Sequence, residues 1–186
     1  MNTSITLRRS AVVALGTALI ATGVAAPASA APDRLSAGSL SFPTSALPGW
    51  TITPAQGGGA SVARAPFGTV GTWASQVSVG DFGRSGLDVK ALAKAFAEKL
   101  ASGGGYNGYG ARIEGLQVTD TSVSGIRAGR ATANVLLQNA PTRGERLRVT
   151  VVDTVPETYF ISQVPFEAAD RRAQADAAEA GLVATR

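Results

Sequence analysis

Residues 127–155, with the sequence RAGRATANVLLQNAPTRGERLRVTVVDTV, contain two segments in which apolar and polar residues alternate. One face carries the apolar residues Ala131, Ala133, Val135, Leu137, Leu147, Val149 and Val151, and the other carries Arg130, Thr132, Asn134, Gln138, Arg146, Arg148 and Thr150. This period of two predicts β-strands over 127–138 and 145–155. The turn residues 141–144 between them favour a hairpin. The stretch therefore predicts an antiparallel sheet with one face more polar than the other.

Strand signals continue on both sides of this hairpin. Residues 39–53 predict two strands around a Pro-Gly turn at 48–49, because Pro43 and Pro48 interrupt any helix. Further strands are predicted over 60–67, 74–82, 115–123 and 158–164.

Two segments predict helices. Within residues 88–101 the apolar residues recur at helical spacing, namely Val89, Leu92, Phe96 and Leu100. Asp88 supplies the chemistry of a helix start, and Ser102-Gly103 ends the segment. The second helix, over 167–180, is rich in alanine and stops at Gly181. Segregated strands with two main helices predict an α+β fold built on an antiparallel β-sheet.

The N-terminus has the features of a signal peptide. A basic pair, Arg8-Arg9, precedes an apolar stretch over 11–24, and residues 28–30 (ASA) match a cleavage signal. We expect cleavage of 1–30, a flexible lead-in over 31–38, and a single domain over 39–186. The apolar stretch is shorter than the roughly 20 residues of a spanning helix, so no transmembrane segment is expected after cleavage. Both general secretion and twin-arginine export remain open.

The composition of the 186 residues excludes several classes of protein. The chain has no cysteine and no histidine, so it lacks a disulfide framework, and no lipid can be attached to an N-terminal cysteine. Nucleophilic systems that need histidine or cysteine, and zinc or haem sites with those ligands, are excluded. Removal of 1–30 leaves 15 of the 17 basic residues beside 13 acidic ones, a balance that does not indicate nucleic-acid binding. No cofactor or metal site is predicted.

Residues 103–110 (GGGYNGYG) formally contain the G-x-G-x-x-G pattern of dinucleotide-binding loops. That pattern requires glycines after a strand and before a helix, where the helix N-terminus faces the phosphates. Here the glycines follow the predicted helix 88–101, so a nucleotide site is not expected. Tyr106 and Tyr109 on this loop are candidates for contact with a sugar or a protein partner, and simple packing is the other interpretation.

Several segments together resemble the LpqN/LpqT-type secreted proteins of actinobacteria. They are FPTSALPGW at 42–50, the amphipathic helix near Leu87, VSGIRAGRA at 123–131 and YFISQVPFEAADRRAQADAAEAGLVAT at 159–185. The resemblance implies a PsbP-like αβα sandwich and a non-enzymatic binding protein of the cell envelope or the extracellular space. Many members look like lipoproteins, whereas this chain has no cysteine to carry a lipid.

The polar face of the central hairpin provides the main candidate site. Arg130, Arg146 and Arg148 should project from the same face, with Arg127 and Arg143 near its ends. We expect few acidic residues near them, so these guanidinium groups could bind an anionic envelope glycolipid or an acidic protein patch. A solvated face whose arginines maintain solubility is the alternative interpretation.

A second function class stays open, that of a carbohydrate-active envelope hydrolase using paired carboxylates. The candidates for such a pair are Glu114, Asp120, Glu145, Asp153 and Glu157. They are scattered at predicted strand ends and turns, as solvated charges usually are. Binding is therefore the preferred prediction.

Overall fold

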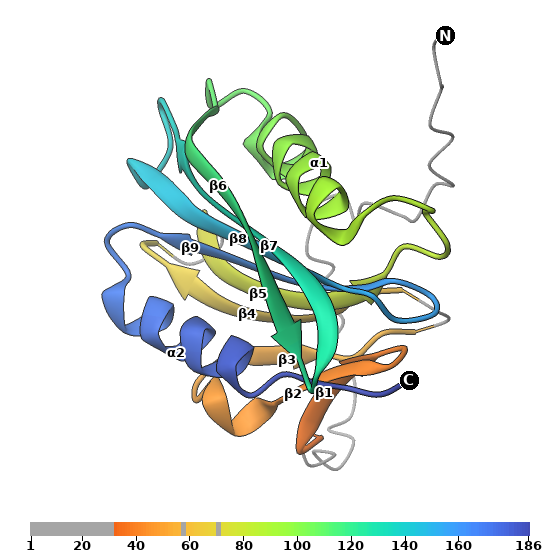
Figure 1. Ribbon diagram of the computed structural model, residues 1–186. Helices are drawn as coiled ribbons and strands as arrows, with labels where there is room; N and C mark the ends of the chain where they lie inside the picture. The colour runs from red at the N-terminus through yellow and green to blue at the C-terminus, as the bar shows by residue number, and fades with distance from the viewer. Residues whose placement is uncertain (1–31, 57–58, 70–71) are drawn as a thin grey trace, which may run out of the picture.

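The computed structural model describes residues 32–56, 59–69 and 72–186 (Figure 1). The predicted signal peptide and its cleavage site lie outside these residues. A seven-stranded antiparallel sheet has the order β3-β4-β5-β9-β8-β7-β6. Its strands are β3 (Thr51–Thr53), β4 (Ser61–Phe67), β5 (Trp73–Asp81), β6 (Arg112–Val123), β7 (Ile126–Leu136), β8 (Gly144–Val152) and β9 (Thr158–Pro165). The predicted antiparallel sheet is therefore confirmed in the described residues.

A smaller sheet contains three short strands in the order β1-β2-β10. They are β1 (Arg34–Ala37), β2 (Leu40–Pro43) and β10 (Val183–Ala184). The two main helices are α1 (Val89–Ala101) and α2 (Ala169–Ala180), and two short 3-10 turns are η1 (Thr44–Ala46) and η2 (Gly104–Tyr106).

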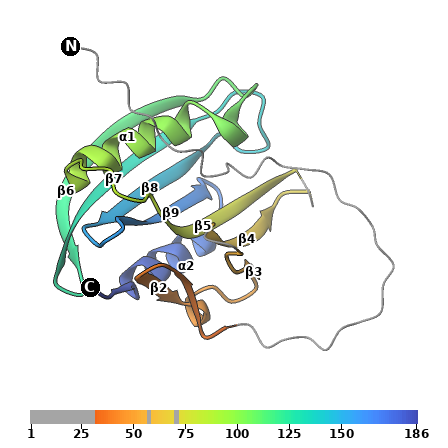
Figure 2. The same ribbon diagram turned by 90° about the vertical axis from the view of Figure 1, so that its right-hand side faces the viewer.

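The elements form layers around the large sheet. Helix α1 covers one face over β6, β7 and β8, whereas α2 and the small sheet cover the opposite face (Figures 1 and 2). The expected α+β architecture, an antiparallel β-sheet packed with two main helices, is thus confirmed. Other elements therefore cover one face of the central strands and part of the other, so the polar face is not simply a solvated one.

Strands β7 and β8 form the predicted hairpin. Arg130 pairs with Thr150, and Asn134 pairs with Arg146, across the two strands. Paired residues of an antiparallel ladder project to the same face. The predicted division of the hairpin into an apolar and a polar face is therefore correct.

Helix α1 begins where Asp88 caps it. Its Oδ1 atom accepts hydrogen bonds from the backbone nitrogens of Lys90 at 2.9 Å and Ala91 at 3.4 Å. The buried face consists of Val89, Leu92, Ala93, Ala97 and Ala101. It is therefore rotated from the predicted stripe, because Phe96 and Leu100 are only half-buried at its edge. Small alanines let the helix approach the sheet closely.

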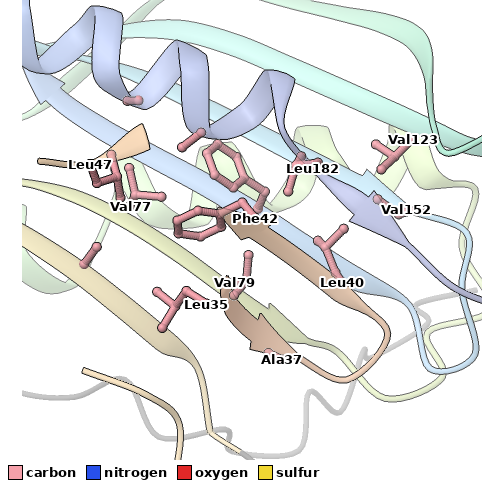
Figure 3. Close-up of a cluster of buried hydrophobic side chains, with 14 of the residues drawn as sticks. Leu35, Ala37, Leu40, Phe42, Leu47, Val77, Val79, Val123, Val152 and Leu182 are labelled. Carbon is pink, nitrogen blue, oxygen red and sulfur yellow. The ribbon is translucent and has the colours of Figure 1, made fainter. Parts of the chain in front are cut away.

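A second core lies on the opposite face, between the large sheet and the small one (Figure 3). The rings of Phe42 in β2 and Phe160 in β9 meet edge to face with centroids 5.7 Å apart. Leu35, Leu40, Val77 and Val79 surround them and are almost completely buried. The small sheet therefore belongs to the folded domain.

The two strands predicted within 39–53 are both present, β2 in the small sheet and β3 in the large one. The predicted flexible lead-in is wrong, since its residues 34–37 form β1, in which Leu35 and Ala37 alternate with exposed residues and enter the core. The ordered domain thus begins before residue 39.

Candidate ligand-binding site

The three arginines of the predicted site lie on one face of the sheet, but helix α2 covers part of that face. Arg148 contacts two acidic residues of α2, with Nη1 lying 2.7 Å from Oδ1 of Asp176 and also hydrogen-bonding to Glu179. Arg130 Nε lies 2.8 Å from Oε1 of Glu179. The expectation that few acids lie near these arginines is therefore wrong. The acids come from a helix about 30 residues away along the chain.

Arg148 is part of the packing between the sheet and α2. Its side chain is 13% exposed, and that of Glu179 is 3% exposed. Burial alone would lower the pKa of Arg148, but the carboxylates of Glu179 and Asp176 raise it above its usual value. Thr150 also donates a hydrogen bond of 2.6 Å to Glu179. These contacts indicate a structural role for Arg148. Glu179 also takes up one hydrogen-bond donor of Arg130.

Arg127, Arg143 and Arg146 have different surroundings. Arg127 forms an ion pair with Asp88, and Arg143 Nε lies 3.0 Å from Oε1 of Glu167. Arg146 is half-buried and forms no ion pair with any of the described residues. Of the three predicted arginines, Arg146 is therefore the one whose guanidinium group is not neutralised by a carboxylate of the described residues.

The two tyrosines of the glycine-rich loop pack against the domain. Tyr106 is buried, and its hydroxyl group donates to Glu145 and accepts a hydrogen bond of 2.7 Å from Nε2 of Gln163. Tyr109 is half-buried and meets the ring of Trp73 edge to face at 5.1 Å. These contacts support the packing interpretation of both residues. In its described position, Tyr106 is not accessible to a ligand.

Glu145 lies at the centre of this buried cluster. Its side chain accepts hydrogen bonds from Tyr106 and, at 2.6 Å, from Nε1 of Trp73. Burial raises the pKa of Glu145 above its usual value, although both hydrogen bonds act in the opposite direction. Burial and the neighbouring Glu145 carboxylate likewise raise the pKa of Tyr106. The cluster anchors the loop after α1 to the first residues of β8.

The other carboxylates considered for catalysis are dispersed. Asp120 is paired with Lys90 at 2.9 Å, and Glu114 is paired with Arg112 at 2.6 Å. Glu157 accepts a hydrogen bond of 3.1 Å from the backbone nitrogen of Ser85. Within the described part of the chain, no three His, Cys, Asp or Glu side chains gather as a metal site would require.

An open groove of about 500 Å³ lies on the face of the sheet that carries Arg146. Its lining residues are Asn134, Leu136, Arg143, Phe166 and Arg172. They come from the end of β7, the β7–β8 turn, the segment after β9 and the first turn of α2. Arg146 is the cross-strand partner of Asn134, so the Cβ atoms of the two residues are expected about 5 Å apart on the same face. The groove therefore combines cationic, amide and apolar groups.

A glycine and an aromatic ring shape the floor of the groove. A Cβ atom at Gly144 would lie 2.5 Å from Cε2 of Phe166, so only glycine lets this ring rest on the start of β8. The backbone nitrogen of Phe166 donates to the carbonyl group of Gly144 at 3.0 Å. Arg172 Nη2 donates to the carbonyl group of Phe166 at 3.2 Å. These bonds hold the ring and one guanidinium group side by side.

Glu167 connects the rim of the groove to α2. Its carboxylate accepts hydrogen bonds from Oγ1 of Thr142 at 2.7 Å and from Nε of Arg143 at 3.0 Å. The hydrogen bonds from Thr142 and, to a smaller extent, from Arg143 lower the pKa of Glu167 to about 2. Burial acts in the opposite direction but is outweighed. Glu167 is thus ionised at neutral pH and holds the β7–β8 turn.

Sequence reasoning identified Arg146 but missed Phe166 and Arg172 as neighbours of a shared groove. Arg143 was placed only near the end of the arginine face. The helical period assigns Phe166 to the apolar stripe of the second helix, although Phe166 precedes that helix, and Arg172 is one of several charges on the same alanine-rich helix. Their proximity depends on how α2 crosses the sheet.

Comparison with known proteins supports the fold. No protein-family model matches the sequence, and no curated protein matches it. Among solved structures, the chain is similar to the solution structure of cyanobacterial PsbP (CyanoP) from Synechocystis sp. PCC 6803, with a TM-score of 0.51. The chain has a PsbP-like fold. The similarity covers 87% of this chain and 99% of the PsbP chain at 11% sequence identity. At that identity, the PsbP-like similarity concerns the fold alone.

The structure also bears on the expected absence of a transmembrane segment after cleavage. In the described residues, neither α1 nor α2 nor any other helix has the length and apolar character needed to cross a membrane.

Proposed function

We propose that this protein is a secreted, non-enzymatic binding protein of the LpqN/LpqT type that acts in the bacterial cell envelope or the extracellular space. Its partner is a protein or an anionic component of the envelope. The groove beside Arg146 carries this proposal, because it brings guanidinium and apolar side chains to an open surface. Guanidinium groups make paired hydrogen bonds to phosphate and carboxylate.

Binding rather than catalysis is supported by the chemistry of the chain. The sequence has neither histidine nor cysteine. Among the candidate carboxylates, Glu145 is buried beneath Tyr106 and Trp73. The residues that line the groove in the described part of the chain include no carboxylate, and the rim residue Glu167 is already bonded to Thr142 and Arg143. The groove thus offers groups that hold an anion, and no pair of carboxylates for glycoside hydrolysis.

Secretion rests on the sequence of residues 1–30, and the LpqN/LpqT assignment rests on the segments that resemble that family. Mass analysis of the protein from culture supernatant tests the export step. We expect a mature chain that begins at Ala31. Recovery of only the full-length chain, associated with membranes, would contradict secretion.

The binding function is tested with the mature chain from residue 31, immobilised and exposed to an envelope extract. We expect retention of an acidic component that raised salt elutes, since charged contacts weaken with ionic strength. The double variant Arg146→Ser/Arg172→Ser should lose this retention. The exposed Arg84 lies near the β8–β9 turn, at the opposite end of these strands, so Arg84→Ser is the matched control.

Equal retention by the mature protein and the double variant would show that the groove is not the binding site. Cleavage of envelope glycans by the protein, abolished by substitution of a carboxylate, would overturn the non-enzymatic assignment.

A further inference from the structure

We propose that the groove binds a small anionic amphiphile, a molecule in which one phosphate or carboxylate group is joined to an apolar chain. This inference rests on the proposed binding function and names the ligand class of the same site. It follows from the charge of the groove, its apolar floor and its size.

Arginine side chains outnumber carboxylates around the groove. Arg143 and Arg172 line it, and Arg146 lies across from Asn134 on the same face. Glu167, the acidic residue attached to this rim, already accepts hydrogen bonds from Thr142 and Arg143. Arg172 donates to the backbone carbonyl group of Phe166, which carries no net charge. The guanidinium groups of Arg146 and Arg172 are therefore available for an anion.

The apolar part of the groove lies directly beside these cations. Leu136 follows Asn134 by two residues in β7, so both side chains project to the same face. Phe166 lies over Gly144 and is half-buried, as is Leu136. A free inorganic anion would leave these two apolar side chains in contact with water. A ligand that fills the groove would therefore contain apolar atoms next to its charge.

The groove has room for a small ligand. Its volume of about 500 Å³ falls within the range of roughly 300–1,000 Å³ that is typical of small-molecule sites. Asn134 adds an amide group that can donate to a phosphate or carboxylate oxygen, or accept from a hydroxyl group. The ligand class is accordingly a single anionic head with an attached chain of modest length.

Three related probes separate the two parts of the site. Octyl phosphate has both a head and a chain, inorganic phosphate has only the head, and octanol has only the chain. We expect isothermal titration of the mature protein, below the concentration at which octyl phosphate forms micelles, to give one octyl phosphate per chain. Inorganic phosphate and octanol should each bind at least about tenfold more weakly, because each lacks one set of contacts.

Variants locate the binding. Arg146→Ser and Arg172→Ser should each weaken octyl phosphate binding by about tenfold or more, the usual effect of losing a charged hydrogen bond. Leu136→Ser should weaken octyl phosphate but leave the weak binding of inorganic phosphate unchanged. Arg84→Ser should leave all three affinities unchanged, and circular dichroism checks that each variant is folded.

The outcomes are distinct. Inorganic phosphate binding as tightly as octyl phosphate, or octanol doing so, would overturn the amphiphile assignment. Unchanged octyl phosphate affinity in folded Arg146→Ser and Arg172→Ser variants would overturn the location. Failure of octyl phosphate to bind, together with arginine-dependent retention of an envelope component, would overturn this inference and leave the proposed binding function intact. Absence of octyl phosphate binding together with absence of arginine-dependent retention would overturn this inference and the proposed binding function.

A vesicle experiment separates two sources of the same chemistry. Co-sedimentation with vesicles of phosphatidylglycerol but not of phosphatidylcholine would identify a lipid within a membrane. Binding of octyl phosphate without vesicle binding would identify a dispersed amphiphile.

Discussion

Arg148 of β8 and Glu179 of α2 form an ion pair in the layer between the large sheet and the helix. The two residues are 31 positions apart, and Glu179 is almost completely buried. Because Glu179 also accepts hydrogen bonds from Arg130 and Thr150, one carboxylate links two neighbouring strands to α2. Helix α2 is thus held on a polar surface by charge rather than by apolar packing alone.

Replacing Glu179 by glutamine tests this link. The change keeps the shape of the side chain but removes the charge that Arg148 and Arg130 face, so the free energy of unfolding should fall by about 2 kcal/mol. Chemical denaturation followed by circular dichroism measures the loss. Asp170→Asn is the matched control on the same helix, because its side chain is 77% exposed, and it should change stability by less than about 0.5 kcal/mol.

A double variant distinguishes the pair from general packing. Arg148→Met combined with Glu179→Leu removes both charges, and it should recover much of the stability lost by Glu179→Gln. A double variant that is less stable than both Arg148→Met alone and Glu179→Leu alone would contradict the idea that an unpaired buried charge causes the loss.

The contact between α1 and Gly129 of β7 provides a second prediction. A Cβ atom at Gly129 would lie 2.6 Å from the backbone nitrogen of Lys90 and from the carbonyl oxygen of Val89. Gly129→Ala should therefore push α1 away from the sheet and lower the free energy of unfolding by about 1–3 kcal/mol. Gly105→Ala is the control, since nothing lies within 4 Å of the added atom. Equal thermal midpoints for the two variants would mean that the helix does not approach this closely.

The features that sequence reasoning predicted correctly are local ones. The alternation in 127–138 and 145–155 directly reflects the pleat of β7 and β8, and Asp88 marks the start of α1 through its own side chain. Such signals depend on a few neighbouring residues. They are therefore readable without knowledge of the rest of the fold.

The features that were missed depend on distant parts of the chain. Asp176 and Glu179 look like ordinary charges of a polar helix until α2 is placed over Arg148. Strand β1 is only four residues long and is ordered by its pairing with β2. The groove likewise exists only where β7, the β7–β8 turn and α2 meet. A local sequence pattern does not show which distant elements come into contact.

The inclusion of β1 in the domain leads to a third prediction. Leu35 is 1% exposed, and the carbonyl group of Ser36 accepts a hydrogen bond of 2.6 Å from Oγ of Ser61. A chain that begins at residue 39 should be less stable than the mature chain from residue 31, because it lacks these contacts. Leu35→Ala in the chain from residue 31 should by itself cost about 3 kcal/mol. If thermal unfolding gives the same midpoint for all three proteins, β1 contributes nothing to the fold.

A fourth prediction concerns the acidic range. Hydrogen bonds from Thr142 and Arg143 hold the pKa of Glu167 at about 2, below its usual value of 4.5. The stabilisation from this carboxylate is present above pH 4.5 and is lost as the pH falls towards 2. Glu167→Gln should therefore lower the free energy of unfolding at pH 7, with a difference from the unchanged protein that shrinks between pH 4.5 and pH 2. A constant difference over that range would show that the ionised form of Glu167 does not stabilise the β7–β8 turn.

The buried Glu145 predicts the opposite pH dependence. Burial raises the pKa of Glu145 above its usual value of 4.5, so the folded protein binds the proton of this group more tightly than the unfolded chain does. Its stabilising effect is full below that usual value and is lost as the pH rises through the folded-state pKa. Relative to Glu145→Gln, which cannot titrate, the unchanged protein should lose up to about 1.4 kcal/mol of unfolding free energy per pH unit over that interval. Denaturation at a series of pH values from about 4 to 8 measures the difference, and a difference that stays constant would mean that Glu145 titrates alike in the folded and unfolded states.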